Sequence, residues 1–145
     1  PDLIKKASEI YGNQSIVVSI DVKKNIWGQY KLYSHRDNKK IKYDLVQFIK
    51  KMESLGAGEI IINSVDNDGV MKGYDCNLIE IVSKSVKIPI IALGGAGNIQ
   101  DLKSAIIHGA SAVAAGSLFV YQGILRGVLI SYIKSELLTK ELLKK

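Results

Sequence analysis

Apolar residues in this chain recur in two patterns, one with the spacing of a helix face and one as short continuous runs. Recurrence every three or four residues predicts amphipathic helices, and short apolar runs predict strands that are covered on both faces. The two patterns alternate along the chain, which predicts repeated helix–strand units. Helices are expected over residues 2–11, 45–55, 99–108 and about 122–134, with a helical tail to 145. A further helix is expected from a cap at Asp75 to a stop before Pro89. Strands are expected over 15–20, 59–64, 88–93 and 111–119.

A polar, lysine-rich insert over residues 22–40 interrupts this alternation and contains Trp27 among several tyrosines. The insert is longer than a usual strand-to-helix loop, and its own alternation predicts a short exposed hairpin over the strand ends. Its aromatic rings are expected to cover apolar surface, and stacking on a ligand is the alternative. No linker or low-complexity segment divides the chain, so residues 1–145 are expected to form a single domain.

Strands that are separated by helices require right-handed crossovers and therefore a parallel sheet, both of whose faces need a cover. Two α/β architectures are compatible with this, a small doubly wound sheet and half of a closed (β/α)8 barrel. Helix spacing does not distinguish them, but functional-looking residues stand at the carboxyl end of every predicted strand, which favours the barrel. The chain also opens on Pro1 rather than Met and enters a helix at once, which predicts a fragment of a longer chain.

A glycine-rich turn follows the predicted strand 88–93 and precedes Asn98, which is placed to cap the next helix. Gly94, Gly95 and Gly97 remove the side chains that would keep an anion away from backbone N–H groups and a helix N-terminus. A tight turn without a ligand is the plainer alternative. The next strand delivers Gly116 and Ser117 at its own end. Two such neighbouring ends predict a phosphate site, which barrels often build after their last two strands.

Carboxylates stand at the ends of the two earlier strands. Asp21 follows the run 15–20, and a loop with Asp66, Asp68 and Gly69 follows the run 59–64. Acids at these ends are expected beside the phosphate site. Plainer alternatives are that Asp21 ends its strand or caps a turn, and that Asp66 braces its loop by hydrogen bonding.

Composition excludes several classes of function. The chain of 145 residues is 47% hydrophobic and 23% charged, which is typical of a soluble globular protein. Its net charge of +6 comes from lysines spread over the sequence rather than from an arginine-rich stripe with aromatics. This argues against a nucleic-acid partner and suits an anionic small substrate. No signal peptide or membrane-spanning run is present in the sequence, so no membrane partner and a cytoplasmic location are expected.

The remaining candidate residues carry weaker signals. Cys76 is the single cysteine and has no ligand-type neighbours, so neither a disulfide nor a metal is expected. Lys23 and Lys24 are expected to be solvated. His35 and His108 have no base or ligand partner in the sequence, and His108 falls in a last helical turn, where a cation is favourable.

Four segments carry a resemblance to a known family: Val18–Lys23 around Asp21, residues 56–75 with their Asp-x-Asp-Gly loop, Gly94–Gly97, and Gly109–Ser117. In order and spacing they are similar to the second half of the cyclase subunit of imidazole glycerol phosphate synthase (HisF). The resemblance spans nearly the whole chain and implies a (β/α)8 TIM barrel. This chain would supply strands five to eight, a (β/α)4 half-barrel.

The same resemblance implies a lyase/cyclase of histidine biosynthesis. Such a cyclase takes ammonia from a glutaminase subunit (HisH), cleaves phosphoribulosyl formimino ribotide (PRFAR), and releases imidazole glycerol phosphate and aminoimidazole carboxamide ribotide (AICAR). It implies no cofactor and no metal. This half alone is expected to be inactive or weakly active.

Residue roles follow from the resemblance. Asp21 corresponds to one of the family's two catalytic carboxylates, and the other lies on the first strand, which this chain lacks. Two carboxylates across a barrel mouth suit a reaction that needs a proton donor and an acceptor on opposite sides of the substrate. The residues expected to bind substrate and phosphate are Asn63, Asp68, Gly69, Gly94, Gly95, Gly116 and Ser117.

Two positions depart from the family pattern, because Asn63 replaces a usual threonine and Leu93 a usual serine. The lost hydroxyl at Leu93 leaves a second hypothesis open, a HisF-like paralogue that works with a glutaminase and installs an amidino group on a surface-polysaccharide sugar. A third, of another class, is a non-catalytic half-barrel that binds phosphate. Its open edges and sheet face are expected to pair with the missing N-terminal half or with a second copy.

Overall fold

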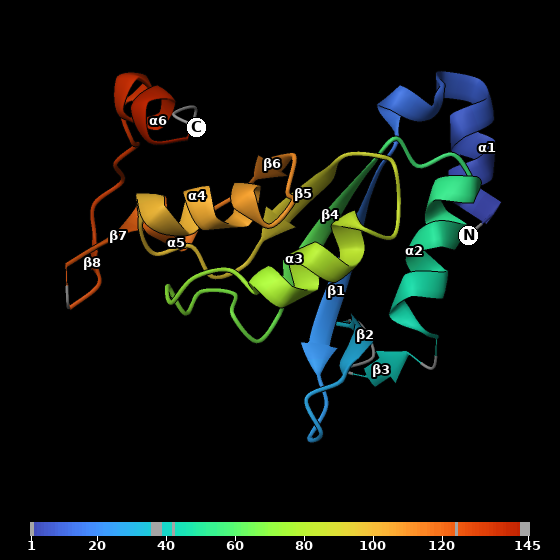
Figure 1. Cartoon of the computed structure of the whole chain (residues 1–145), viewed down its shortest axis with the longest axis horizontal. Coiled ribbons are helices and arrows are strands. Elements are labelled where there is room, and N and C mark those ends of the chain that lie inside the picture. Colours follow the sequence, from blue (N-terminus) through green and yellow to red (C-terminus); the bar gives the residue numbers. More distant parts are fainter. Residues whose placement is uncertain (1, 36–38, 42, 124, 143–145) are drawn as a thin grey trace.

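The protein is described from a computed structural model, which places residues 2–35, 39–41, 43–123 and 125–142. Its main sheet has six strands in the order β3-β2-β1-β4-β5-β6 (Figure 1). Four of these strands are parallel neighbours, as expected from the helix–strand alternation, and β2 and β3 extend the sheet as an antiparallel hairpin. The bounds are β1 Val17–Lys24, β2 Tyr30–Ser34, β3 Lys39–Ile41, β4 Glu59–Ser64, β5 Ile90–Leu93 and β6 Ala112–Val113.

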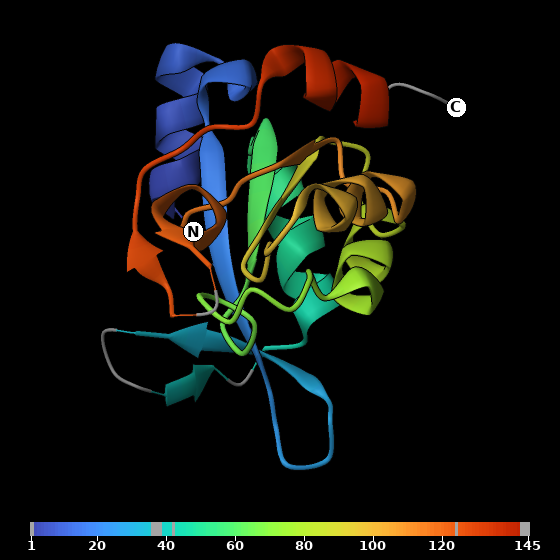
Figure 2. The same ribbon diagram turned by 90° about the vertical axis from the view of Figure 1, so that its left-hand side faces the viewer.

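Three helices, α2 (Leu45–Ser54), α3 (Cys76–Ser83) and α4 (Ile99–Ile107), lie together on one side of the sheet (Figure 2). Each begins at a side chain that accepts hydrogen bonds from the first-turn N–H groups, as N-caps do. The predicted caps at Asp75 and Asn98 are confirmed, and Asn98 forms a reciprocal capping box with Asp101. Asp44 caps α2 in the same way.

The core lies between these helices and one face of the sheet. Strand residues of alternating positions supply it, because successive side chains point to opposite faces. Ile20, Ile60, Ile62, Ile90 and Ala92 are all less than 5% exposed. The opposite face carries the intervening residues and is more open, with Val17 49% exposed. The expected half-barrel is therefore an open α/β sheet, with β3 at one edge and β6 at the other.

The insert after the first strand forms the expected hairpin, but the strand is longer than predicted. It starts at Val17, after a 3₁₀ turn (η1, Asn13–Ser15), and runs to Lys24 before the turn that leads into β2. Trp27 at that turn is 78% exposed, so the expectation that it covers apolar surface is wrong. Residues 36–38 of the insert lie outside the described residues.

The C-terminal quarter differs most from prediction. Only Ala112–Val113 of the predicted strand 111–119 pairs in the sheet, and Ser117–Val120 is a short helix, α5. The helix predicted over 122–134 is absent from the described part of that segment, which holds a two-stranded hairpin of β7 (Tyr121–Gln122) and β8 (Gly127–Val128) beyond the β6 edge (Figure 1). Gly123 has a positive φ of 70° and Arg126 one of 50°, neither compatible with a right-handed helix.

The tail helix is confirmed over α6, Ser135–Leu142, and residues 143–145 lie outside the described part. The first helix, α1 (Asp2–Tyr11), also forms as predicted, but its apolar stripe is not buried. Leu3 is 78% and Ile10 71% exposed, and Ile4 packs partly against the core. The Ser8 hydroxyl donates to the Leu55 carbonyl at 3.2 Å and ties α1 to the end of α2. Among the placed residues, every helix is too short or too polar to span a membrane.

Candidate functional site

The carboxyl ends of three parallel strands gather most of the predicted site residues. The loops after β4, β5 and β6 meet there and leave a narrow pocket of about 10 Å³, room for a single water molecule. Ligand binding at this pocket stays a prediction. The pocket is lined by Asp68, Gly69, Leu93, Gly94, Gly95, Ala96, Ala115, Gly116 and Ser117, which include six of the residues expected to contact substrate or phosphate.

Asp21 and Asn63 form a second group on the open face of the sheet. They are register partners on the neighbouring strands β1 and β4, so their side chains lie on the same face. The Asn63 amide donates from Nδ2 to Oδ1 of Asp21 at 2.9 Å. Asp21 lies within β1 rather than at its end, so the reading of this residue as a strand terminator or turn cap is wrong.

The Asn63 amide is oriented by its carboxylate neighbour. An ionised carboxylate accepts hydrogen bonds only, so the NH2 group must face Asp21 and the carbonyl must face away. That carbonyl oxygen, Oδ1, is buried and has no hydrogen-bond partner among the described residues. Buried acceptors without a partner are uncommon and costly. It lies toward Gly94, where a Cβ atom would come within 2.7 Å of it.

The glycines of the β5 turn serve close packing. Gly94 has a φ of 90°, and a Cβ there would also come within 2.7 Å of the Ser64 carbonyl. A Cβ on Gly95 would lie 2.1 Å from the Gly73 carbonyl, and one on Gly97 would lie 2.3 Å from that of Met71. The plainer reading of these glycines, a turn that lets two loops approach, is therefore supported by the geometry.

The N-terminus of α4 is occupied by its own side chains, contrary to the expectation that it faces an anion. The Asp101 carboxylate accepts from the N–H groups of Gly97 at 2.8 Å and Asn98 at 3.1 Å. The Asn98 side chain in turn accepts from Gln100 and Asp101. An anion at the pocket would accordingly rely on the loops of Gly94, Gly95 and Gly116 rather than on this helix end.

The Asp-rich loop is braced from two sides. Asp66 accepts from the backbone N–H of Lys24 at 2.7 Å, which supports the bracing role over substrate contact for this residue. Asn67 closes the loop by donating from Nδ2 to the Gly73 carbonyl at 3.0 Å. Arg126 of the C-terminal hairpin donates from Nη2 to the Val70 carbonyl at 3.0 Å. Asp68 is left exposed at the pocket.

His35 was not expected at the site, yet it reaches Asp21. Its Nε2 lies 3.5 Å from Oδ2 of Asp21, and its ring stacks edge-on against Tyr33 with centroids 4.9 Å apart. The signal for this contact is the hairpin register, since the antiparallel pairing of Val22 with Leu32 brings the end of β2 to the middle of β1. Sequence reasoning predicted the hairpin but assigned it no register.

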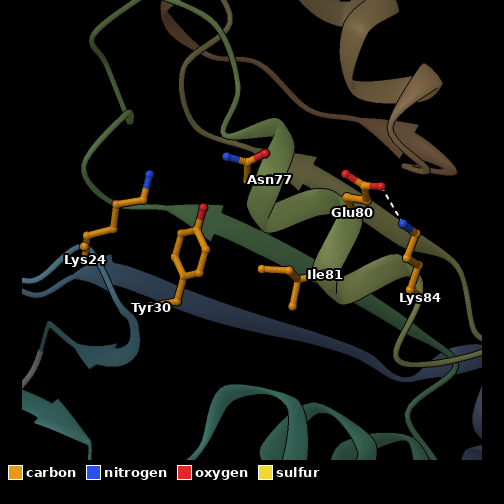
Figure 3. Close-up of a pocket in the computed structure, with 7 residues that line it drawn as sticks. Lys24, Tyr30, Asn77, Glu80, Ile81 and Lys84 are labelled. Carbon is orange, nitrogen blue, oxygen red and sulfur yellow. Dashed lines mark hydrogen bonds and ion pairs between the residues drawn. The ribbon is translucent and has the colours of Figure 1, made fainter.

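A larger groove of 550 Å³ lies outside this site, between the β1–β2 hairpin and α3. Figure 3 shows Lys24 and Tyr30 on one wall, and Asn77, Glu80, Ile81 and Lys84 on the other. Beside it, the buried Asp75 carboxylate accepts from the Tyr30 hydroxyl at 2.7 Å and lies 2.7 Å from the Lys24 ammonium. Lys24 is thus ion-paired, and the expectation that it is merely solvated is wrong.

The three groups shift one another's titration. The hydrogen bond to Asp75 raises the pKa of Lys24. Burial, and then the hydrogen bond to Asp75, raise the pKa of Tyr30 to about 12. Burial alone would raise the pKa of the Asp75 carboxyl, but hydrogen bonds from Lys24 and Tyr30 outweigh it and hold the pKa below its ordinary value. This cluster fastens the hairpin that carries His35 to the start of α3.

No metal centre is formed by the residues that the structure places, since nowhere among them do three His, Cys, Asp or Glu side chains converge. Cys76 lies with its Sγ 3.3 Å from the Ser104 hydroxyl, between α3 and α4. It therefore packs between helices and takes no part in the site at the strand ends.

Comparison with known proteins identifies the family of this chain. The family model described as "Histidine biosynthesis protein" matches residues 1–126. A relative named "Putative imidazole glycerol phosphate synthase subunit hisF2", from Pseudomonas aeruginosa, is 44% identical over 131 residues, which are 90% of this chain and 52% of the relative. Imidazole glycerol phosphate synthase subunit HisF of Petrotoga mobilis is 43% identical over 122 residues, 83% of this chain and 48% of the relative.

These relatives are similar to most of the chain, and the chain spans about half of their length. HisF of Chlorobaculum tepidum repeats the pattern, with 42% identity over 84% of this chain and 49% of the relative. The family match covers the segments that carry Asp21, Asn63 and both glycine-ended strands. The chain therefore belongs to the histidine biosynthesis protein family, and it is similar to about half the length of HisF subunits.

Proposed function

We propose that this chain is the C-terminal half of an imidazole glycerol phosphate synthase cyclase subunit, and that the completed barrel carries out ammonia-dependent cleavage and cyclisation of PRFAR. The observation that carries the proposal is the pair of Asp21 and Asn63 on the open face of the sheet, beside the glycine turn of Gly94. The pair sits where the HisF-like resemblance expects a catalytic carboxylate. The products are imidazole glycerol phosphate and AICAR.

In this proposal Asp21 transfers protons on one side of the substrate. Attack of ammonia on an imine and the later ring closure each need a proton to be given and another to be removed. The second carboxylate is supplied by the first strand of the full barrel. Asn63 holds Asp21 by its Nδ2, while its buried Oδ1 faces the β5 turn at Gly94.

The phosphate end of the substrate is assigned to the pocket of Gly94, Gly95, Gly116 and Ser117, with Asp68 and Gly69 at its rim. Backbone N–H groups in glycine turns bind phosphate because no side chain blocks them. The pocket has about 10 Å³ in this structure, too little for a phosphate group. Binding then requires the loops after β4 and β6 to separate, which the absence of side chains on these glycines eases.

The open sheet requires partners. β2 pairs with β1 only over Val22–Lys24. The rest of that edge of β1 and the half-exposed inner face are to be covered by the N-terminal half-barrel, or by a second copy of this chain in its absence. A glutaminase subunit of the HisH kind supplies the ammonia. We propose a cytoplasmic location and no cofactor, in line with the chemistry of the residues at the site.

One observation favours the second candidate function, installation of an amidino group on a surface-polysaccharide sugar. Leu93 lines the candidate phosphate pocket at a position where the family usually has serine. An aliphatic side chain there offers no hydrogen bond, so a substrate that needs one at this point is disfavoured. This reading keeps Asp21, the glutaminase and the ammonia chemistry and changes only the acceptor.

Turnover of PRFAR tests the proposal. The chain is joined to its N-terminal half, ammonium salt is the nitrogen donor, and the parent is compared with Asp21→Asn. We expect formation of imidazole glycerol phosphate by the parent and a loss of about 10²-fold or more in kcat in the variant. A folded protein that binds inorganic phosphate but leaves PRFAR intact would move the assignment to the sugar-modifying reaction or to a non-catalytic binder. Turnover of an amidino-acceptor sugar separates those two.

A further inference from the structure

His35 reaches Asp21 from a different element. The imidazole stands at the turn after β2, and its Nε2 lies 3.5 Å from Oδ2 of Asp21, the oxygen opposite the one that Asn63 occupies. Asp21 is 29% exposed and His35 62% exposed. The carboxylate thus has an amide on its buried side and an imidazole on its solvent side.

The contact is supported by neighbouring groups. The Tyr33 ring meets the His35 ring edge-on with centroids 4.9 Å apart, a favourable geometry for two aromatic rings. The Tyr33 ring also contacts the Lys23 ammonium, which lies 5.3 Å from the ring centroid. Among the described residues, Asp21 and Tyr33 contact the imidazole, and Lys23 contacts Tyr33. Asp21 and Tyr33 also line a cavity of 140 Å³.

From this geometry we propose that His35 is a positioning residue for Asp21 that also exchanges its proton with solvent. The proposal rests on the proposed cyclase function. When Asp21 gives a proton to the substrate, the neutral His35 ring transfers its Nε2 proton to the Asp21 carboxylate and takes a proton from solvent at Nδ1, which restores the carboxyl group. Exchange with water then returns the proton of the ring from Nδ1 to Nε2. When Asp21 accepts a proton, the ring with its proton on Nδ1 takes that proton at Nε2 and releases the Nδ1 proton to solvent.

Histidine suits this role because it is the side chain whose ordinary titration range lies nearest neutral pH. Asp21 is 29% exposed in the open sheet, and a cover over this face in the completed barrel would reduce its contact with bulk water, so a solvent-open neighbour can carry its proton. His35 is held on a hairpin that the Lys24–Asp75–Tyr30 cluster fastens to α3. The imidazole therefore stays at the carboxylate while remaining open to solvent.

The tautomer of the ring tests the contact on this chain alone. Contact with Asp21 requires the proton of the neutral His35 ring on Nε2, whereas His108 contacts the Ser104 carbonyl at 2.8 Å through Nδ1 and so carries its proton there. We expect ¹⁵N NMR of the neutral rings to show these opposite tautomers. In Asp21→Ala, His35 should become a mixture while His108 is unchanged. A mixture at His35 in the parent chain, or no change in the variant, overturns the proposal.

Turnover by the completed barrel tests the proton exchange. His35→Gln keeps an N–H donor but cannot exchange a proton, and His35→Leu keeps neither; His108→Gln is the control. We expect both His35 variants to lose about tenfold in kcat with little change in KM. The loss is smaller than the roughly 10²–10⁴-fold of a direct general acid or base, because His35 acts through Asp21. Added imidazole should restore most of the lost kcat.

A parental kcat in His35→Gln without added imidazole overturns the exchange role. A parent barrel without PRFAR turnover would instead contradict the proposed function, and the tautomer measurement on this chain still decides whether His35 is coupled to Asp21.

Discussion

Gly94 shows how one residue serves both packing and the candidate site. It adopts a φ of 90°, and a Cβ would come within 2.7 Å of the Asn63 side chain and of the Ser64 backbone. Any larger residue at position 94 would strain the backbone and would displace Asn63 or Ser64. The missing side chain therefore sets the separation between the β5 turn and the residues that hold Asp21.

Replacement of Gly94 by alanine is expected to lower the free energy of unfolding by about 2–4 kcal/mol, the sum of strain and steric terms. Gly28→Ala is the matched control, because Gly28 has a similar positive φ of 75° but nothing within 4 Å of its Cβ position. Urea denaturation measures both. Equal losses in the two variants would show that the close approach at Gly94 carries no cost.

At the residue scale, the sequence predicted which residues lie at the candidate site better than it predicted what each residue contacts. The neighbourhood of Gly69, Gly94 and Gly116 follows from where strands end, which apolar runs reveal. Asp21 instead lies within β1, because that strand continues to Lys24. The contact of His35 with Asp21 depends on a pairing register that only the folded hairpin defines. The orphaned Asn63 oxygen depends on which way its amide turns, and that is decided by its neighbour.

The hairpin attachment is a feature at the scale of elements, and its strength depends on pH. The pKa of Asp75 is lowered in the folded protein, so its contribution is present above the ordinary value and is lost as pH falls through the folded pKa. The pKa of Lys24 is raised, so its contribution is present below the ordinary value and is lost as pH rises through the folded pKa. The attachment is therefore strongest at neutral pH.

Asp75→Asn tests this dependence while retaining an N-cap for α3, since asparagine caps as well as aspartate. We expect the variant to be less stable than the parent by about 1 kcal/mol at pH 7, a small value because Lys24 is 42% exposed and solvent screens the pair. The difference should shrink below about pH 4, near the ordinary range of Asp. Urea titrations at several pH values measure it, and a pH-independent difference would rule the ion pair out as its source.

Among elements, those with local signals matched best. The strand 59–64 and the caps at Asp75 and Asn98 depend on a few neighbouring residues, and all were predicted correctly. The helix predicted over 122–134 failed because Gly123 and Gly127 weaken helix formation, and in its described part most apolar side chains are exposed. Leu125, Val128, Leu129 and Ile130 are each at least 64% exposed.

For the whole molecule, the decisive feature is the sheet that stays open. The face opposite α2, α3 and α4 leaves Val17 49% exposed, and α1 leaves Leu3 and Ile10 uncovered. The open parallel sheet and its carboxyl-end cluster were predictable from the alternation of elements. The described residues form no closed barrel, since β1 is flanked by β2 and β4 and the sheet ends at β3 and β6.

Mixing with the N-terminal half is expected to raise the thermal unfolding midpoint of this chain by several degrees, because apolar surface leaves water and binding stabilises the folded form. Differential scanning calorimetry measures the midpoint, and light scattering reports whether the chain alone forms a second-copy assembly. An unchanged midpoint together with a monomeric chain would contradict the expected pairing of the open face.

The hydrogen bond from the Lys24 backbone to Asp66 has a consequence for how this sequence can change over evolution. A strand shifted by one residue turns every side chain to the opposite face, which would move Asp21 among the helices. The bond fixes the end of β1 against the loop after β4. Selection should therefore remove variants with an insertion or deletion between Val17 and Lys24. The tip around Ile26 and Trp27, exposed by 86% and 78%, carries no such constraint. Length variation among descendants of this chain should therefore collect at that tip.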